Sequence, residues 1–448
     1  MSPTPNPSKP SDSLDLLEQV LPSSAFATFD EGHTRVFSTW MVLWLMIYQR
    51  THQNATLSAA VQEMLFGSTS SRLPDCKRTR EQSLSRNTGG YSQARSALPV
   101  AAAVQAIEMM SRTMIIDEPA TWNGRRTFLI DGTSITTGHH PELLKAFPPA
   151  SNQHGQSHWP VIRLVVSHEL GSGLAMRPFY GPMYGSHAVS ETGLARNLLG
   201  QFNDPAMIIY DRNFGIFSMS HAAVAAGHGV LARMTDKRFQ SLLRQATLTG
   251  PGEWTLQWRP SRYDIEATPD LSKDAIVHGR LIEVAIEHEG KTTLLRLFTT
   301  DMTSTPGQLA ALYARRWSVE GDIRSVKQTL SLDKLTCKSV EMAEKEILLA
   351  MVAYNLVIQV RRLAARQVGI EPRRLSFTSV LTSVQAFCNN LELAKTPEEL
   401  EKRFELLLRV AAQSRLPNRN KFRSYPREVV PRRRGFPERK RKTTEQKN

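Results

Sequence analysis

The spacing of apolar residues predicts a helical N-terminal region. Apolar side chains recur at intervals of three and four over residues 14–66, and neither Gly nor Pro interrupts the apolar stretches. This periodicity is typical of amphipathic helices. The longest apolar run covers residues 36–48, which is 48 − 36 + 1 = 13 residues. Such a run is too short to cross a bilayer and favours a buried helix.

A polar and basic stretch at residues 68–99 follows, and we interpret it as a linker or a DNA-contacting loop. A helix is expected over residues 100–110. From Thr127 the pattern changes to short apolar runs that are typical of strands, two of them flanking the turn Leu-Gly-Ser-Gly of a predicted hairpin. Helical segments at residues 190–201 and 220–227 alternate with the later strands. This order predicts a mixed α/β sheet.

Further along the chain, a β-rich block and several helices are expected. Three apolar runs between residues 240 and 300, separated by turn residues, predict an insertion of small strands. A long helical pattern begins at Pro306, with Thr305 as its cap, and more helices are expected at residues 341–367 and 397–412. From Pro417 the periodicity ends and basic residues dominate, which predicts a flexible basic tail.

Composition adds a large positive charge. The 448 residues include 56 Lys and Arg against 42 Asp and Glu, so 56 − 42 gives a net charge of +14. The length allows about two to four domains, and an apolar fraction of 41% excludes wholesale disorder. The charge indicates a polyanionic partner, nucleic acid or an acidic membrane surface, the alternative being a merely soluble basic protein.

The cysteines and the N-terminus indicate the compartment. Three scattered cysteines without a C-x-x-C pair form neither a disulfide framework nor a zinc site, and they fit a reducing compartment. The N-terminus is rich in Pro and Ser and lacks the apolar core of a signal peptide. We therefore expect a cytoplasmic protein with no membrane partner.

Two aspartates interrupt the most apolar strands. Asp131 follows Phe-Leu-Ile and Asp211 follows Ile-Ile-Tyr. A carboxylate at the edge of a buried sheet is costly unless it is paired, hydrogen-bonded or bound to a metal. Either residue alone could simply end its strand and cap a turn, but on the first and fourth strands of one sheet they form a candidate shared site.

The helix that starts at Pro306 carries a third acid among cations. At about 100° per residue, one arc of about 60° contains four side chains: Tyr313, Arg316, Glu320 and Lys327. Asp322 projects to the opposite side, which makes it a poor rival to Glu320. The alternative is a solvated helix face with ion pairs. Trp317 and Ile323 project beside the arc, so we expect this face to be at least half buried.

Three carboxylates can hold two Mg²⁺ ions, because this hard cation prefers oxygen ligands. Two such ions about 3.5–4 Å apart stabilise the attacking and the leaving oxygens of a phosphoryl displacement. Basic residues on the helix of Glu320 would hold the DNA backbone beside the scissile phosphate. The residues therefore predict metal-dependent cleavage of DNA.

These residues resemble a known family. The segment YARRWSVEGDIRSVK matches the Y-x2-R-x3-E-x6-K signature of the DDE transposases of bacterial insertion sequences, of the insertion-sequence-four type. The resemblance extends to LIDGTSIT around Asp131, to IIYDRNFG around Asp211, and to YSQARSALP, and it covers roughly residues 14–435. The four-residue signature is specific, whereas DGT alone is weak.

The resemblance implies a ribonuclease-H-like α/β core with Asp131, Asp211 and Glu320 as catalytic metal ligands for two Mg²⁺ ions, which Mn²⁺ can replace. It implies phosphate contacts from Tyr313, Arg316 and Lys327 to terminal inverted repeats. The double-stranded DNA partners are these repeats and the target, held by a dimer on DNA. The implied reaction is endonucleolytic nicking followed by strand transfer, in several relatives through a hairpin, by an enzyme that is cytoplasmic and nucleoid-associated. Arg212 either contacts DNA or is a surface residue.

Some relatives stack a flipped base on a Trp of the β-rich insertion. Trp254 and Trp258 lie in that block, but Trp258 precedes Glu320 by 320 − 258 = 62 residues, and no motif aligns either of them. We expect both to be strand core residues, which leaves the hairpin route open.

The expected domain boundaries follow from pattern and resemblance together. They are a disordered N-terminus (1–13), a helical DNA-binding domain with basic linker (14–98), the first part of the core (99–239), the β-rich insertion (240–303), the core helix with the catalytic Glu (304–335), a helical C-terminal region (336–416) and the basic tail (417–448).

Rival classes fit less well. A haloacid-dehalogenase-type phosphatase needs a nucleophilic aspartate where this chain has Leu129, and a dinucleotide-binding enzyme needs a glycine-rich turn after the first strand. A metal site is conceivable from four histidines that we expect at the surface: His139, His140, His154 and His158. An inactive or domesticated DNA-binding relative remains the alternative from another class, although the intact carboxylates argue against it.

Overall fold

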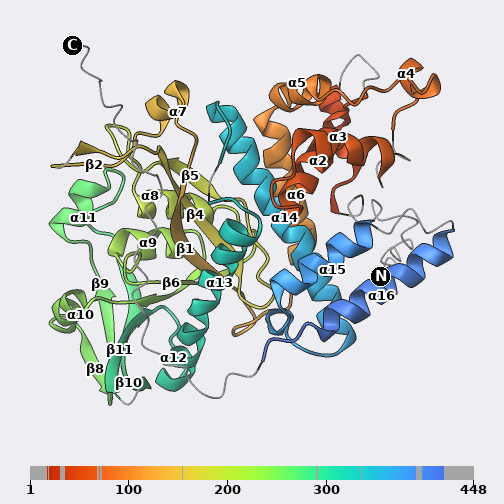
Figure 1. Ribbon diagram of the computed structural model, residues 1–448. Coiled ribbons are helices and arrows are strands. Elements are labelled where there is room, and N and C mark those ends of the chain that lie inside the picture. Colours follow the sequence, from red (N-terminus) through yellow and green to blue (C-terminus); the bar gives the residue numbers. More distant parts are fainter. Residues whose placement is uncertain are drawn as a thin grey trace, which may run out of the picture.

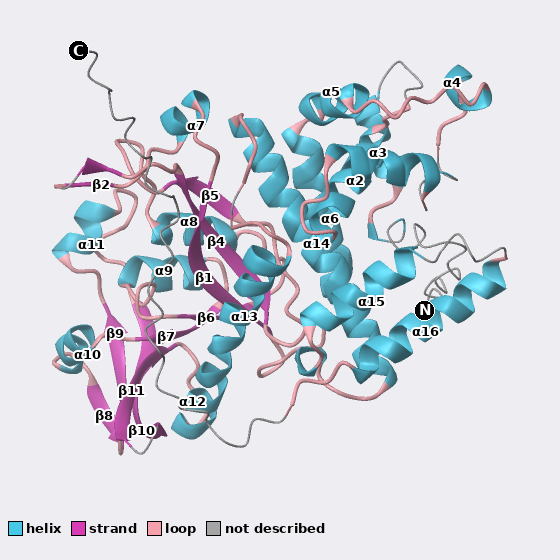
Figure 2. Cartoon of the chain, viewed as in Figure 1, coloured by secondary structure: helices cyan, strands magenta, loops and turns pink. Residues whose placement is uncertain are grey.

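The computed structural model describes residues 18, 20–30, 36–67, 70, 73–153, 155–288, 291–333, 335–389 and 396–417. The expected N-terminal segment 1–13 and the basic tail beyond residue 417 lie outside these residues. A long helix, α14 (Val340–Gln367), runs between a helical part and a part that contains the sheet (Figure 1). All the strands lie on one side of α14 (Figure 2).

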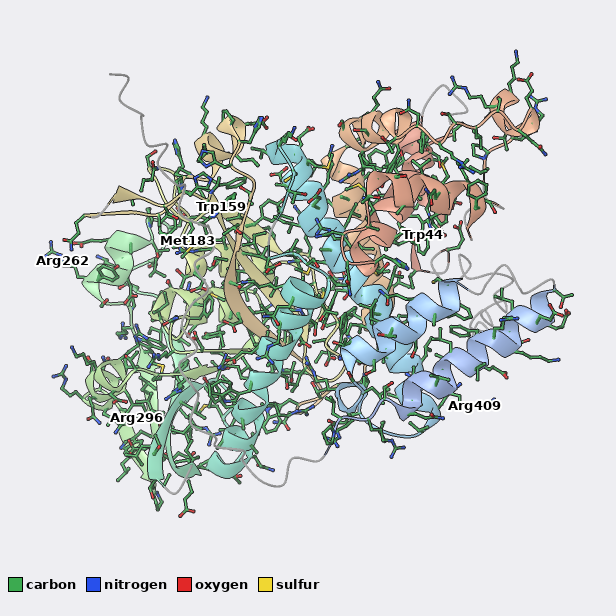
Figure 3. All side chains as sticks on the ribbon, viewed as in Figure 1. Trp44, Trp159, Met183, Arg262, Arg296 and Arg409 are labelled. Atoms are coloured by element: carbon green, nitrogen blue, oxygen red, sulfur yellow. The ribbon has the colours of Figure 1, made fainter. Side chains whose placement is uncertain are left out.

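The helical part is built around α2, which is buried nearly all round. Ser38 caps α2 by accepting a hydrogen bond from the Met41 N–H, and Trp44, labelled in Figure 3, lies inside this part. The apolar run at residues 36–48 is therefore a core helix, as predicted. The elements are a 3₁₀ helix (Ser23–Asp30), α2 (Thr39–Thr51), α3 (Leu57–Phe66), α4 (Lys77–Arg80), α5 (Gly89–Ala97) and α6 (Val100–Ile116).

The linker expected at residues 68–99 is wrong in part, because this stretch contains α4 and α5. Helix α5 starts on two glycines and its one buried residue is Tyr91, so it has almost no apolar periodicity. The Tyr91 hydroxyl donates to Gln49 Oε1 at 2.8 Å and ties α5 to α2. Tertiary packing, rather than local pattern, makes this segment helical.

The second part contains one mixed sheet of nine strands, in the order β5-β4-β1-β6-β7-β11-β10-β9-β8. Strands β1, β6 and β7 are parallel, and the other neighbours are antiparallel. The nine strands are β1 (Arg126–Thr136), β4 (Val161–Glu169), β5 (Phe179–Pro182), β6 (Ala206–Tyr210), β7 (Gly229–Arg233), β8 (Thr247–Gly250), β9 (Glu253–Trp258), β10 (Val277–His288) and β11 (Lys291–Thr299). A separate pair is formed by β2 (Ser151–Asn152) and β3 (Gly155–Gln156).

The expected β-rich insertion is present, but it is not a separate small sheet. Strand β11 pairs directly with β7, so the block continues the core sheet. The predicted hairpin is also present, since β4 and β5 pair antiparallel. The helices of this part are α7 (Pro141–Ala146), α8 (Glu191–Leu199), α9 (Phe217–Ala225), α10 (Asp236–Leu243) and α11 (Arg262–Ala267). Arg262 of α11 extends outward at the edge of the molecule (Figure 3).

Helices cover both faces of the sheet. On one face Ile130 and Ile208 pack with residues of α8, α9 and α10, and on the other Leu129 and Ile209 pack with residues of α12. Alternate residues of a strand point to opposite faces, which explains why the apolar runs are continuous instead of alternating. The architecture is the mixed α/β, ribonuclease-H-like core that was predicted.

The helix expected from Pro306 is a series of short pieces. Thr305 caps α12 in a capping box with Gln308, as predicted. The chain then continues through α12 (Pro306–Ala314), a 3₁₀ turn (Arg315–Trp317), α13 (Ser318–Arg324) and a π turn (Ser325–Thr329). The uniform winding assumed for the sequence is therefore wrong in detail, because 3₁₀ turns wind more tightly and π turns more loosely than an α-helix.

The C-terminal helices complete the fold. They are α14, a 3₁₀ turn (Pro372–Arg374), α15 (Phe377–Asn389) and α16 (Pro397–Gln413). Helix α14 is long and apolar enough to cross a membrane, but 83% of its most apolar window is buried inside the protein. It is the core helix that joins the two parts.

Candidate active site

Asp131 and Asp211 lie at the same level on neighbouring parallel strands. Ile130 of β1 is paired with Tyr210, the last residue of β6, so each aspartate is the next residue after a paired position. Asp131 is two residues from Leu129, and Asp211 is two residues from Ile209. Both therefore point to the face covered by α12 and α13.

The Asp131 carboxylate is partly buried and weakly compensated. Its Oδ1 accepts a hydrogen bond from the Gly132 N–H at 2.9 Å, and Arg316 Nη1 lies 3.7 Å from its Oδ2. Burial raises the pKa of Asp131 to about 6, and the nearby charges of Asp211 and Glu191 add to this, against the opposing effects of Gly132 and Arg316. Asp211 accepts a hydrogen bond from the Asn213 N–H at 2.8 Å. The site is thus rich in negative charge.

Arg316 connects Glu320 of α13 to Asp131 of β1. Its Nη2 lies 3.3 Å from Glu320 Oε1 while its Nη1 lies near Asp131. The Arg316 side chain is 10% exposed and that of Glu320 is 44% exposed, so the glutamate stands at the open rim of the site. The structure therefore places Asp131, Arg316 and Glu320 together, with Asp211 beside Asp131.

Tyr313 and Lys327 flank this group. Tyr313 is 5% exposed in the core cluster under the sheet face, and burial raises its pKa, while Arg316 and Arg233 oppose the rise. Lys327 Nζ donates to the Ser134 carbonyl at 2.7 Å and to Thr133 Oγ1 at 3.1 Å, and burial lowers its pKa. All four members of the signature therefore lie on the β1 side of the helix, despite the breaks in its winding.

Other sequence predictions have mixed outcomes. Arg212 is exposed beside Asp211. Trp258 is 4% exposed and packs edge-on against Phe298, while Trp254 packs edge-on against Phe239, so both are strand residues as expected. The helix face is buried at Tyr313 and Arg316, as expected, but Trp317 does not contribute to that burial. It is 63% exposed and lies under the Arg316 guanidinium, because the 3₁₀ turn at this point rotates it out of the packed face.

The histidine alternative gains no support. His139 and His158 stack with ring centroids 4.0 Å apart, and His139 Nδ1 is bonded to the His158 carbonyl, which is a backbone contact. His154 lies outside the described residues. Among the residues that the structure describes, no three His, Cys, Asp or Glu side chains are close enough to form a ready-made metal site.

Sequence reasoning missed Glu191, the first residue of α8. A Cβ atom built on Gly132 would lie 1.6 Å from Glu191 Oε1, so the glutamate rests against the backbone next to Asp131. Burial raises the pKa of Glu191, Arg163 opposes this, and Asp211 adds to it. Its sequence setting, a Ser followed by an acid at a helix start, is that of any ordinary cap, so no local signal marked it.

Sequence reasoning also missed the partners of Asp322. This side chain is buried on the other side of α13, where Arg373 Nη1 donates to its Oδ1 at 2.8 Å and lies 2.7 Å from its Oδ2. The Tyr354 hydroxyl lies 3.0 Å from the same Oδ1. Arg373 also donates to the carbonyls of Glu169 and Leu170. Asp322 therefore fastens α13 to α14 and to the end of β4.

Comparison with known proteins agrees with this architecture. Residues 122–356, which span the sheet, the helix with Glu320 and the first half of α14, match the transposase DDE domain family. The chain therefore belongs to the DDE transposases, metal-dependent enzymes that cleave DNA. A similar protein is the transposase InsG for insertion sequence element IS4 of Escherichia coli strain K12, 27% identical over 315 residues that cover 69% of this chain and 68% of that protein. The chain is a transposase of this IS4 type.

The donor set fits the divalent metals on which this family depends. Carboxylate oxygens are the preferred ligands of Mg²⁺, and Asp131 of β1, Asp211 after β6 and Glu320 of α13 approach the end of β6 from three elements. In the described geometry Arg316 lies between Asp131 and Glu320.

Proposed function

We propose that this transposase binds the terminal inverted repeats of its element and cleaves and joins DNA strands at Asp131, Asp211 and Glu320. One observation carries the proposal: Arg316 spans the strand acid and the helix acid, at 3.7 Å and 3.3 Å, beside a second aspartate in register on the next strand. Two Mg²⁺ ions, or Mn²⁺ in their place, would stabilise the attacking and leaving oxygens.

The residues of the chain have separate tasks in this proposal. The two aspartates, fixed by the sheet, would hold the metals, and Glu320 would complete the site from the helix. Water attacks phosphorus first, and the 3′-oxygen leaves as a hydroxyl. In the second step this hydroxyl attacks a phosphorus of the target strand, and the 3′-oxygen of the target strand leaves. Because two ends must be joined, two chains would act together on the DNA, in the cytoplasm at the nucleoid.

The flanking residues would position the DNA at different depths. Tyr313 and Arg316 are almost inaccessible, so any phosphate that they touch lies at the floor of the site. Lys327 is half buried at the end of β1, and Arg212 is exposed, so both would meet the backbone on either side. The expected domain boundaries, including the N-terminal helical domain as the reader of the repeats, belong to the same proposal.

Cleavage assays on labelled transposon ends test the site. With Mg²⁺ or Mn²⁺, Asp131→Ala, Asp211→Ala and Glu320→Gln should each abolish cleavage and joining, by at least about 10³-fold, while DNA binding survives. The matched control is Glu398→Gln, an exposed acid at the start of α16. Undiminished cleavage by Glu320→Gln would remove it from the site. A wild-type chain that binds the ends but never cleaves them would be an inactive relative.

Salt dependence tests the phosphate contacts. Lys327→Ala should weaken binding to transposon ends and reduce the slope of log affinity against log salt by about 0.9, because each neutralised phosphate releases counterions. Arg316→Ala should act in the same direction. Lys402→Ala, at an exposed position of α16, serves as the control. An unchanged slope for both site variants would exclude them from the interface.

A further inference from the structure

Glu191 brings a fourth carboxylate to the two aspartates from the other face of the sheet. Gly132 is two residues from Ile130, whose side chain packs with α8, whereas Asp131 faces Arg316. The position of a Cβ on Gly132, 1.6 Å from Glu191 Oε1, shows that the glutamate occupies the space that any larger residue would fill. Glycine at this point of β1 is what allows the carboxylate to reach the backbone beside Asp131.

The end of β6 explains how acids from two faces can meet. Strand β1 pairs with β6 only as far as Ile130 and Tyr210, and it continues to Thr136 with β4 alone as its partner. Among the described strands, none therefore pairs with β1 on that side beyond Tyr210. Glu191 reaches the backbone beside Asp131 from the face of α8, and Glu320 lies on the other face, where Arg316 connects it to Asp131.

The Glu191 carboxylate lacks donors of its own. In the part of the chain that the structure describes, it has neither a hydrogen bond nor an ion pair. Arg163 attracts it, but the Arg163 Nη1 donates to the Val189 carbonyl at 2.7 Å. A half-buried carboxylate without a donor and beside other acids is costly. A first-turn glutamate could favour the helix dipole equally well while pointing to solvent, so the inward position needs another cause.

We propose that Glu191 binds, through its carboxylate or a water that it holds, the divalent cation shared by Asp131 and Asp211. This inference rests on the proposed function and extends its ligand set from three carboxylates to four. Four carboxylates balance the charge of two divalent cations, and oxygen is their preferred ligand. Gly132 then determines the ligand set of the site, because the absence of a side chain at this position leaves space for the Glu191 carboxylate.

Metal binding by the full chain, without DNA or turnover, tests the assignment. Free Mn²⁺ is followed by electron paramagnetic resonance during titration of Mn²⁺ alone into wild type, Glu191→Gln, Gly132→Ala, Asp211→Asn and the control Glu398→Gln. Glu191→Gln should raise the Mn²⁺ dissociation constant about tenfold or more. Gly132→Ala should do the same, because it keeps the acid but displaces it. Glu398→Gln should bind as wild type does.

The variants separate this inference from the function on which it rests. If Asp211→Asn loses Mn²⁺ while Glu191→Gln and Gly132→Ala keep wild-type affinity, the fourth ligand is excluded and the three-acid site stands. If Asp211→Asn itself binds Mn²⁺ normally, the proposed site fails. Circular dichroism checks that each variant is folded. If Glu191→Gln is unfolded, Gly132→Ala decides alone, because the three atoms nearest to its added methyl all belong to the flexible Glu191 side chain.

Discussion

Two carboxylates two residues apart on α13 have opposite surroundings. Glu320 is 44% exposed by side chain and is contacted only loosely by Arg316, at 3.3 Å. Asp322 is 4% exposed and is bonded by Arg373, with the Tyr354 hydroxyl beside it. The difference teaches that the buried acid, ion-paired with Arg373, holds the helix in place, which leaves the exposed acid on the same helix available for chemistry.

The largest effect on the free energy of unfolding should follow from removing Asp322, the buried acid that is ion-paired with Arg373. Asp322→Ala leaves Arg373 buried without its partner, and breaking such a pair costs about 3–5 kcal/mol of the free energy of unfolding. Glu320→Ala, on the open side of the same helix, should change it by no more than about 0.5 kcal/mol. Urea unfolding of both variants measures this contrast, and equal destabilisation would break the comparison.

The next-largest effect is a pH dependence of the free energy of unfolding, caused by His168 near Asp322. His168 is fully buried with Tyr354 edge-on against it, and burial lowers its pKa to about 4, a change that Asp322 opposes and Arg373 and Arg361 reinforce. An unfolded chain protonates this histidine from about pH 6.5 downward, whereas the folded protein does not until about pH 4. The stability that neutral His168 provides is therefore present above pH 6.5 and lost as the pH falls to 4.

The size of that loss is about 3 kcal/mol, at 1.36 kcal/mol per pH unit. His168→Leu removes the titrating group, so the free energy of unfolding of this variant, measured against wild type in urea at several pH values, should gain on wild type by that amount between pH 7.5 and 4. If the free energies of unfolding of the two proteins changed in parallel with pH, the His168 imidazole would titrate with an ordinary pKa. Its buried surroundings near Asp322 would then not oppose its protonation.

The smallest expected effect is the difference in unfolding free energy between two tyrosine variants, Tyr354→Phe and Tyr313→Phe. The Tyr354 hydroxyl lies 3.0 Å from Asp322 Oδ1 and 2.9 Å from the Gly173 carbonyl, so Tyr354→Phe should cost about 1–2 kcal/mol of unfolding free energy. Tyr313→Phe, on the side of Glu320, should cost less than about 1 kcal/mol, because its hydroxyl faces the site. Thermal unfolding of the pair sharpens the comparison, and a larger cost for Tyr313→Phe would reverse it.

Much of the fold and part of the site follow from sequence, for identifiable reasons. Asp131 and Asp211 each end an apolar run, and the pairing of β1 with β6 places them side by side, as the strand pattern predicts. The contact between Arg316 and Glu320, four residues apart, also follows from the helical arc. Local patterns of this kind depend on one element or on two neighbours, and they are visible in the chain itself.

The rest depends on packing between distant segments. Glu191 reaches the backbone beside Asp131 only because residue 132 is glycine, and Asp322 is bonded by Arg373, 51 residues further along. Trp317 is turned outward by a 3₁₀ turn that the spacing of apolar residues does not predict. Helix α5 forms because Tyr91 docks on α2. Contacts such as these carry no periodicity, so the sequence alone does not reveal them.

The continuity of the sheet has a consequence for synthesis of the protein. Strand β7 is buried and parallel to β6, and its outer edge is covered only by β11. That strand begins 291 − 233 = 58 residues after β7 ends, so at about 5–20 residues per second the ribosome delivers it roughly 3–12 s later. During that interval the nascent chain exposes an unpaired, apolar strand edge. We expect chaperones to bind this edge until the β-rich insertion has emerged from the ribosome.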